Sequence, residues 1–112
     1  MTFPSDQIEE LKNMFPEVFK SEEGGYPFFF IPNFELPTNC TPSVSDVLLC
    51  PTPRDGYNSR LYFSDIIQTS KILNWNANGI RILERNWYAF SWTTKDNLRL
   101  AQMIATHIRG LG

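Results

Sequence analysis

The chain has 112 residues and a formal net charge of -2, which fits one domain of residues 1–112 and leaves little room for a second. Hydrophobic residues make up 42% and aromatic residues 14%, enough for a packed core. No basic run is present, which argues against nucleic-acid binding, and no stretch approaches the ~20 apolar residues of a membrane span. The N-terminus lacks the basic start and apolar centre of a signal peptide, so we expect a cytoplasmic protein that binds neither nucleic acid nor membrane.

The first element predicted is a helix that is capped by Ser5 and ends near Met14. Pro16 interrupts the apolar spacing, because a proline removes one backbone hydrogen bond and clashes with the preceding turn. Residues 15–19 are therefore expected as a turn that packs inward, and residues 21–25 as an exposed turn.

Three apolar runs of strand length follow, at residues 26–31, 44–49 and 61–63. Short runs of aromatic and branched residues, bounded by prolines, glycines and small polar residues, predict strands. Consecutive antiparallel strands of this kind form a meander. Pro32 and Pro37 cannot donate to a ladder, so we expect them at an edge of the sheet or outside it.

Residues 64–78 show no clean period and are rich in asparagine, which predicts an irregular crossing segment with room for a short fourth strand. Residues 80–83 alternate in part and can also pair. A final helix is expected with Thr93 or Thr94 as its cap and Gly110 at its end. Its inner stripe is predicted to be Leu98, Ala101, Ile104, Ala105 and Ile108. The predicted class is α+β: an N-terminal helix, an antiparallel meander sheet, an irregular crossing segment and a C-terminal helix.

Few side chains offer chemistry. His107, the single histidine, is expected as a partly exposed helical residue, because no further metal ligand stands at ligand spacing, and we predict neither a metal nor a cofactor. Cys40 and Cys50 lack a neighbouring base that would lower a thiol pKa, so both are expected to be buried or idle. Asp46 interrupts an apolar strand and either faces solvent or forms a buried pair with Arg60, Arg81 or Arg85.

Three tryptophans, Trp75, Trp87 and Trp92, could form an aromatic platform for a ligand. Together with Tyr57 they are the candidate binding residues. The alternative is that they pack in the core, as large aromatic residues commonly do.

Several segments carry a resemblance that spans most of the chain: IPNFELP at 31–37, DVLLCPTPRDGY at 46–57, LYFSD at 61–65 and LERNWYAFSW at 83–92. Together with the last run, DNLRLAQMIATHIRGL, their order resembles the ubiquitin-conjugating enzyme (UBC) superfamily, in particular its prokaryotic family E. The resemblance implies a UBC-like fold.

An ordinary member of that superfamily has a His-Pro-Asn motif after the third strand and then the cysteine that accepts the ubiquitin thioester. Residues 64–87 contain neither, and both cysteines of the chain precede them. The resemblance therefore implies a non-catalytic UBC-like binding or scaffold subunit of a bacterial ubiquitin-like modification pathway. Its implied partners are a ubiquitin-like protein or an activating enzyme, with a JAB-type metallopeptidase as a further associate.

Two alternatives stay open at this stage. One is an active conjugating enzyme that uses a displaced cysteine, for which Cys40 is the candidate because it lies in a loop between Asn39 and Thr41. The other is a small structural or effector protein that only shares the fold.

Overall fold

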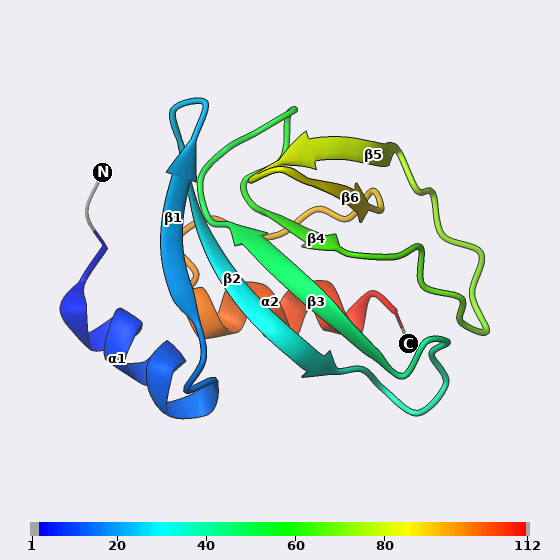
Figure 1. The fold of residues 1–112 in the computed structure, drawn as a ribbon, viewed down its shortest axis with the longest axis horizontal. Helices are drawn as coiled ribbons and strands as arrows, with labels where there is room; N and C mark the ends of the chain where they lie inside the picture. Colours follow the sequence, from blue (N-terminus) through cyan, green and yellow to red (C-terminus); the bar gives the residue numbers. More distant parts are fainter. Residues whose placement is uncertain (1–2, 112) are drawn as a thin grey trace.

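The computed structural model describes residues 3–111, which form an α+β fold of two helices and one curled, six-stranded antiparallel sheet (Figure 1). The predicted α+β class is therefore confirmed. The strand order across the sheet is β1-β2-β3-β4-β6-β5. In chain order the elements are α1 (Ser5–Met14), β1 (Phe19–Glu23), β2 (Tyr26–Glu35), β3 (Val44–Cys50), β4 (Arg60–Phe63), β5 (Ala77–Ile82), β6 (Arg85–Ala89) and α2 (Leu100–Arg109).

Helix α1 ends at Met14, as the proline two residues later predicts. The predicted cap is wrong: Ser5 is the first helical residue, Pro4 precedes it, and no side chain caps the helix. The turn after α1 packs inward through Val18, which is buried, and Phe15, which is half-buried, but Phe19 already belongs to β1 and is 52% exposed, contrary to the expectation.

Strand β1 was not predicted from the sequence. Residues 21–23, expected as part of an exposed turn, pair with β2 in the register Phe19 to Phe30 through Glu23 to Tyr26. The side chains of β1 are mostly exposed, so its sequence carries no apolar signal. Pairing with the apolar strand beside it makes this polar segment a strand.

Strands β2, β3 and β4 lie where the three apolar runs predict them. Strand β2 extends beyond its run to Glu35, because a register shift between Ile31 and Phe34 carries the chain past Pro32. Pro32 therefore lies within β2, at an irregularity and beyond the last β1–β2 pair at Phe30, so that part of the strand is a local edge, as expected. Pro37 does lie outside the sheet.

The crossing segment after β4 is irregular, as predicted, and leads into the β5–β6 hairpin. Leu83 and Glu84 form the hairpin turn with φ angles of 51° and 64°. Both positions of a type I′ turn need positive φ, and they usually hold asparagine or glycine. The strand at residues 80–83 was expected, but the turn after it was not, because leucine and glutamate at positions 83 and 84 give no turn signal.

Helix α2 begins later than predicted. Its N-cap is Arg99, and the predicted caps Thr93 and Thr94 lie in a non-helical segment before it. The buried face of α2 also differs from the predicted stripe, since Ala105 is exposed. The buried residues of this face are Leu100, Ile104 and His107.

Two core layers lie on opposite faces of the sheet. Leu49 belongs to one layer and its neighbour Leu48 to the other, because successive side chains of a strand point to opposite faces. The helix-side core joins α1 and α2 to the sheet and includes Leu11, Phe29, Val47, Leu49, Phe63, Leu100 and Ile104. The hairpin-side core lies between the meander and the β5–β6 hairpin and includes Phe28, Leu48, Cys50, Tyr62, Ile82, Trp87 and Ala89.

Neither α1 nor α2, the helices of residues 3–111, has the length and apolar character needed to span a membrane.

Candidate functional site

Trp87, one of the candidate binding residues, is completely buried in the hairpin-side core. Its Nε1 donates a hydrogen bond of 3.0 Å to the carbonyl oxygen of Ile82, and its ring meets Phe30 edge-on. An indole without exposed surface cannot contact a ligand. The three tryptophans therefore do not form one platform, and for Trp87 the packing alternative is the correct one.

Trp75 and Trp92 lie on the other face, on either side of Phe90. Their ring centroids are 5.3 Å and 6.2 Å from that of Phe90, in edge-to-face geometry. Both indoles are half-buried against the helix-side core, and Trp92 Nε1 donates to the carbonyl oxygen of Thr106 at 3.0 Å. These two rings close the side of the core and present only part of their surface.

Tyr57 joins the segments that carry these two tryptophans. Its hydroxyl lies 2.7 Å from Ser91 Oγ and accepts a bond of 2.9 Å from Asn76 Nδ2. Asn76 Oδ1 in turn accepts a bond of 2.6 Å from Arg60. The bond to Ser91 is the main reason why the pKa of Tyr57 is lowered. Three of the four candidate binding residues are thus brought together, by a polar network that fastens loops to one another.

The histidine of α2 is part of a second polar network, which is buried. His107 is 3% exposed, so the expectation of partial exposure is wrong. Its Nε2 lies 3.0 Å from Ser59 Oγ, which is also 2.9 Å from Thr94 Oγ1. Burial, with a smaller effect of Arg60, lowers the pKa of His107 to about 4. The arrangement resembles a serine–base pair, but Ser59 is 1% exposed and cannot meet a substrate.

Both cysteines are buried, with exposures of 6% for Cys40 and 0% for Cys50. Burial raises the pKa of each thiol, and the protonated sulfur of Cys40 donates to Asn39 Oδ1 at 3.7 Å. The expectation of buried thiols is confirmed. Cys40 does lie beside the crossing segment, because Thr41 exchanges two backbone hydrogen bonds of 2.8 Å with Gln68. No basic side chain lowers its pKa there, so the displaced-cysteine alternative lacks the thiolate that it needs.

Asp46 pairs with Arg85, one of the three arginines considered, at 2.8 Å between Oδ2 and Nη2, but the pair is not buried, because the side chains of Asp46 and Arg85 are 26% and 42% exposed. Its other oxygen accepts a bond of 2.8 Å from the backbone amide of Asn33, at the irregularity of β2. Partial burial alone would raise the pKa of Asp46. The amide of Asn33 and the charge of Arg85 together lower it by more, so the pKa lies below its usual value. One carboxylate thus ties β2, β3 and β6 together, which is a structural task.

Two arginines close the end of the hairpin-side core. The guanidinium of Arg54 lies 4.5 Å from the ring centroid of Tyr26, and Arg60 and Arg54 each lie 5.7 Å from that of Tyr62. Asp55 Oδ2 sits 3.7 Å from Arg60 and 3.9 Å from Arg54. The hydroxyl of Tyr62 has no hydrogen-bond partner among the described residues, and burial raises its pKa to about 12.

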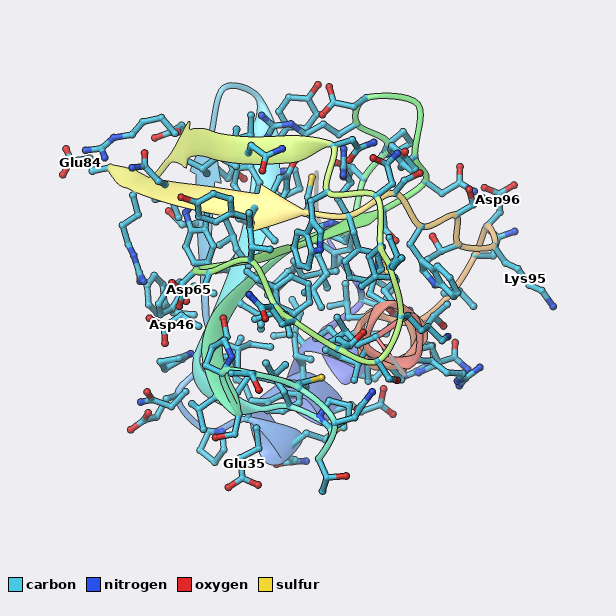
Figure 2. All side chains as sticks on the ribbon, turned by 90° about the vertical axis from the view of Figure 1, so that its right-hand side faces the viewer. Glu35, Asp46, Asp65, Glu84, Lys95 and Asp96 are labelled. Carbon is cyan, nitrogen blue, oxygen red and sulfur yellow. The ribbon has the colours of Figure 1, made fainter. Side chains whose placement is uncertain are left out.

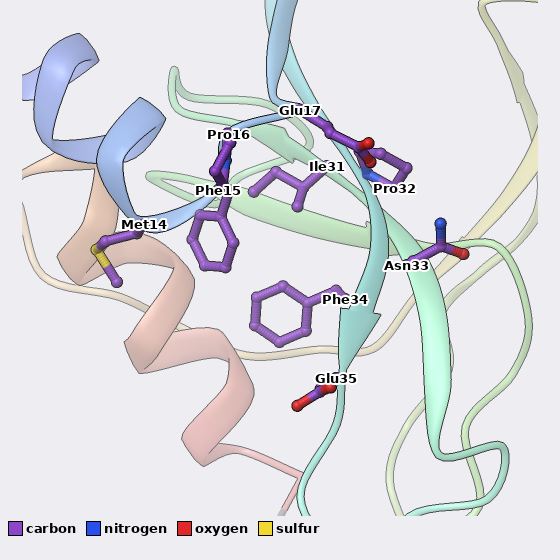
Figure 3. Close-up of a pocket in the computed structure, with 9 residues that line it drawn as sticks. All are labelled: Met14, Phe15, Pro16, Glu17, Ile31, Pro32, Asn33, Phe34 and Glu35. Carbon is purple, nitrogen blue, oxygen red and sulfur yellow. The ribbon is translucent and has the colours of Figure 1, made fainter.

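An apolar groove lies between the end of α1 and the second half of β2 (Figure 3). Its volume is about 520 Å³, within the range of roughly 300–1,000 Å³ that is usual for binding pockets. This groove was not predicted from the sequence. Its signal is two short apolar segments, each broken by a proline and closed by a glutamate. The groove is lined by Met14, Phe15, Pro16, Glu17, Ile31, Pro32, Asn33, Phe34 and Glu35.

Charged side chains lie on both sides of the molecule. Figure 2 shows Asp46, Asp65 and Glu84 along one side of the molecule, with Lys95 and Asp96 on the opposite side. Within residues 3–111, no group of three or more histidine, cysteine, aspartate or glutamate side chains could hold a metal ion.

No protein-family model matches this sequence, and neither the curated proteins nor the solved structures contain a significant match to it. The resemblance to the UBC superfamily therefore stays a prediction that rests on the segments quoted above.

Proposed function

We propose that this chain is a non-catalytic, UBC-like binding or scaffold subunit of a bacterial ubiquitin-like modification pathway in the cytoplasm. The observation that carries the proposal is that both of its thiols are inaccessible and protonated. Cys40 and Cys50 are both buried, their pKa values are raised, and residues 64–87 contain no cysteine. Thioester transfer needs an accessible thiolate, because the thiolate is the nucleophile.

The order of the elements supports the same proposal. A helix is followed by an antiparallel meander and an irregular crossing segment, and a helix comes last, as the resemblance implies; the β5–β6 hairpin stands in addition between the crossing segment and that helix. Strand β1 lengthens the meander from the three predicted strands to four. A fold alone does not establish an activity, so this support is weaker than that of the thiols.

The proposed partners are a ubiquitin-like protein or an activating enzyme, with a JAB-type metallopeptidase as an associated enzyme. The first test is the gene neighbourhood, in which we expect genes for a ubiquitin-like protein and an activating enzyme. Their absence would favour the alternative of a structural or effector protein that only shares the fold.

The second test is reconstitution with ATP and the two neighbouring gene products. We expect a complex with one of them in an affinity measurement, and no adduct of the chain that a thiol reductant cleaves. The proposal is overturned by a reductant-sensitive adduct that Cys40→Ala abolishes and Cys50→Ala leaves intact. The same adduct would establish the displaced-cysteine enzyme.

A further inference from the structure

The groove runs along a part of β2 that has lost one of its neighbours. The pairing of β1 with β2 ends where Phe19 faces Phe30, whereas β2 continues to Glu35 and pairs there only with β3. The chain that would extend β1 backwards instead turns away toward α1 through Pro16. One edge of β2 is therefore open beside the groove.

Backbone polar groups are available at this open edge. Leu36 donates its amide to the carbonyl oxygen of Ser43 at 2.9 Å. Hydrogen-bonded positions alternate along an antiparallel pair, so the N–H and C=O of the preceding residue, Glu35, point away from β3 and toward the groove. Pro32 has no N–H, and the amide of Asn33 is already bonded to Asp46. The edge can thus hold a short stretch of extended chain, but not a long added strand.

The floor of the groove is apolar. The rings of Phe15 and Phe34 pack against each other at a tilt of 37° with centroids 5.3 Å apart, and Ile31 lines the groove beside them (Figure 3). Met14 at the end of α1 is 55% exposed and lines the same space. This surface offers an apolar side chain a contact with two aromatic rings and a flexible thioether.

The rim of the groove is acidic. Glu17 lies on the α1 side and Glu35 on the β2 side, and both are exposed. Neither carboxylate takes part in an ion pair within residues 3–111. No lysine or arginine lines the groove. Charge complementarity therefore favours an occupant with basic side chains beside its apolar one.

We infer that the groove docks a short extended segment of a partner protein, in which an apolar side chain is flanked by lysine or arginine. The apolar side chain packs over the paired rings of Phe15 and Phe34, the flanking cations meet Glu17 and Glu35, and the backbone bonds to Glu35. This inference rests on the proposed function for the view that the chain is a binding subunit, and it names the chemistry of the partner.

A second copy of the chain is the competing occupant. Ile72 is fully exposed and follows Lys71, so this loop has the right chemistry. It carries a cation on only one side of Ile72, because Leu73 follows, whereas the groove has a carboxylate on each rim. A partner segment with a cation on both sides of its apolar residue fits the groove better than this loop.

Synthetic peptides test the inference without knowledge of the natural partner. The first probe is an acetylated heptapeptide of sequence Lys-Val-Lys-Leu-Lys-Val-Lys, the second carries glutamate in place of lysine, and the third carries serine in place of valine and leucine. Binding is measured by fluorescence anisotropy and located from amide chemical shifts in NMR spectra. We expect the first probe to bind about tenfold more tightly than the other two and to shift the amides of residues 31–35.

Charge-reversal variants test the role of the two glutamates, with a charge reversal elsewhere on the surface as the matched control. The double variant Glu17→Lys with Glu35→Lys is expected to lose about tenfold in affinity for the lysine probe and to gain affinity for the glutamate probe. Glu84→Lys makes the same change at the exposed hairpin turn, far from Glu35 (Figure 2), and is expected to leave binding unchanged. Both variants alter exposed side chains, so their folding is retained.

Several results would overturn the inference. They are no binding of the lysine probe at millimolar concentration, equal binding of the lysine and glutamate probes, or amide shifts outside the groove. Self-association in solution that Ile72→Ser abolishes would also overturn it, by placing a second copy in the groove. A partner complex that the double variant leaves intact refutes this inference alone, whereas a cysteine adduct refutes only the proposed function.

Discussion

The two faces of the sheet are closed in different ways. On the helix face, α1 and α2 cover the core, but α1 ends before it reaches the far half of β2, and the groove is left open there. On the hairpin face, β5 and β6 fold over the meander, and Arg54 and Arg60 cover the aromatic rings at its end.

This difference shows where a partner can find apolar surface. The hairpin-side core is sealed so tightly that the hydroxyl of Tyr62 lacks a partner among the described residues. Its aromatic residues, Trp87 above all, serve stability. The helix-side core continues into a concave apolar surface, at whose rim two carboxylates have no ion-pair partner among residues 3–111. Contact with another protein is therefore expected on the helix face and not on the hairpin face.

The largest expected effect comes from a matched pair of core substitutions, one for each face. Leu48 and Leu49 are both completely buried and point to opposite faces. Replacement of either by alanine is expected to lower the free energy of unfolding by about 2–5 kcal/mol, measured by urea denaturation. Ile72→Ala, at a fully exposed position, is the control and should cost under about 0.5 kcal/mol. A similarly small cost for Leu48→Ala would mean that the hairpin does not cover its face.

The helix face is expected to be sensitive to mild acid through His107. Its pKa falls from 6.5 to about 4 in the folded chain, so below pH 6.5 the unfolded state binds a proton that the folded state does not. Stability should therefore decline from pH 6.5 to 4, by roughly 3 kcal/mol at about 1.4 kcal/mol for each pKa unit. Urea denaturation across this range, with His107→Gln for comparison, measures the effect. Equal declines in both proteins would contradict the buried neutral histidine.

The hairpin face is expected to show a smaller effect in stronger acid through Asp46. Its folded pKa is lowered, so its contribution is complete above the unfolded value near 3.8 and is lost as the pH falls through the folded value. Asp46→Asn, which removes the ion pair with Arg85, is expected to cost about 1 kcal/mol at pH 7, since both groups are partly exposed. The difference between this variant and the original chain should shrink below about pH 3.8. A constant difference at all pH values would argue that packing, and not charge, holds β6 against β3.

Much of the fold follows from local signals in the sequence. The end of α1 before Pro16 and the positions of β2, β3 and β4 were predicted, because proline and short apolar runs act over a few residues. The start of α2 was missed, since Thr94 resembles a cap but bonds instead to the distant Ser59. Strand β1 was missed because its polar residues are ordered only by their pairing with β2.

The candidate site was less predictable than the fold. Tyr57, Trp75 and Trp92 do come together, but as a network that fastens loops, and Trp87 lies in the other core layer. The groove combines residues from α1 and β2 that are about twenty positions apart in the sequence. Only the way in which β1 leaves β2 reveals that they share a surface.

Composition and local pattern suffice to predict the class of fold, the meander and the absence of a cysteine from residues 64–87. The tertiary structure decided which side chains are accessible. It buried His107 and both thiols, paired Asp46 with Arg85 and left an apolar groove between two glutamates. Burial and pairing depend on which distant segments pack against each other, and a linear pattern of residue types does not specify those contacts.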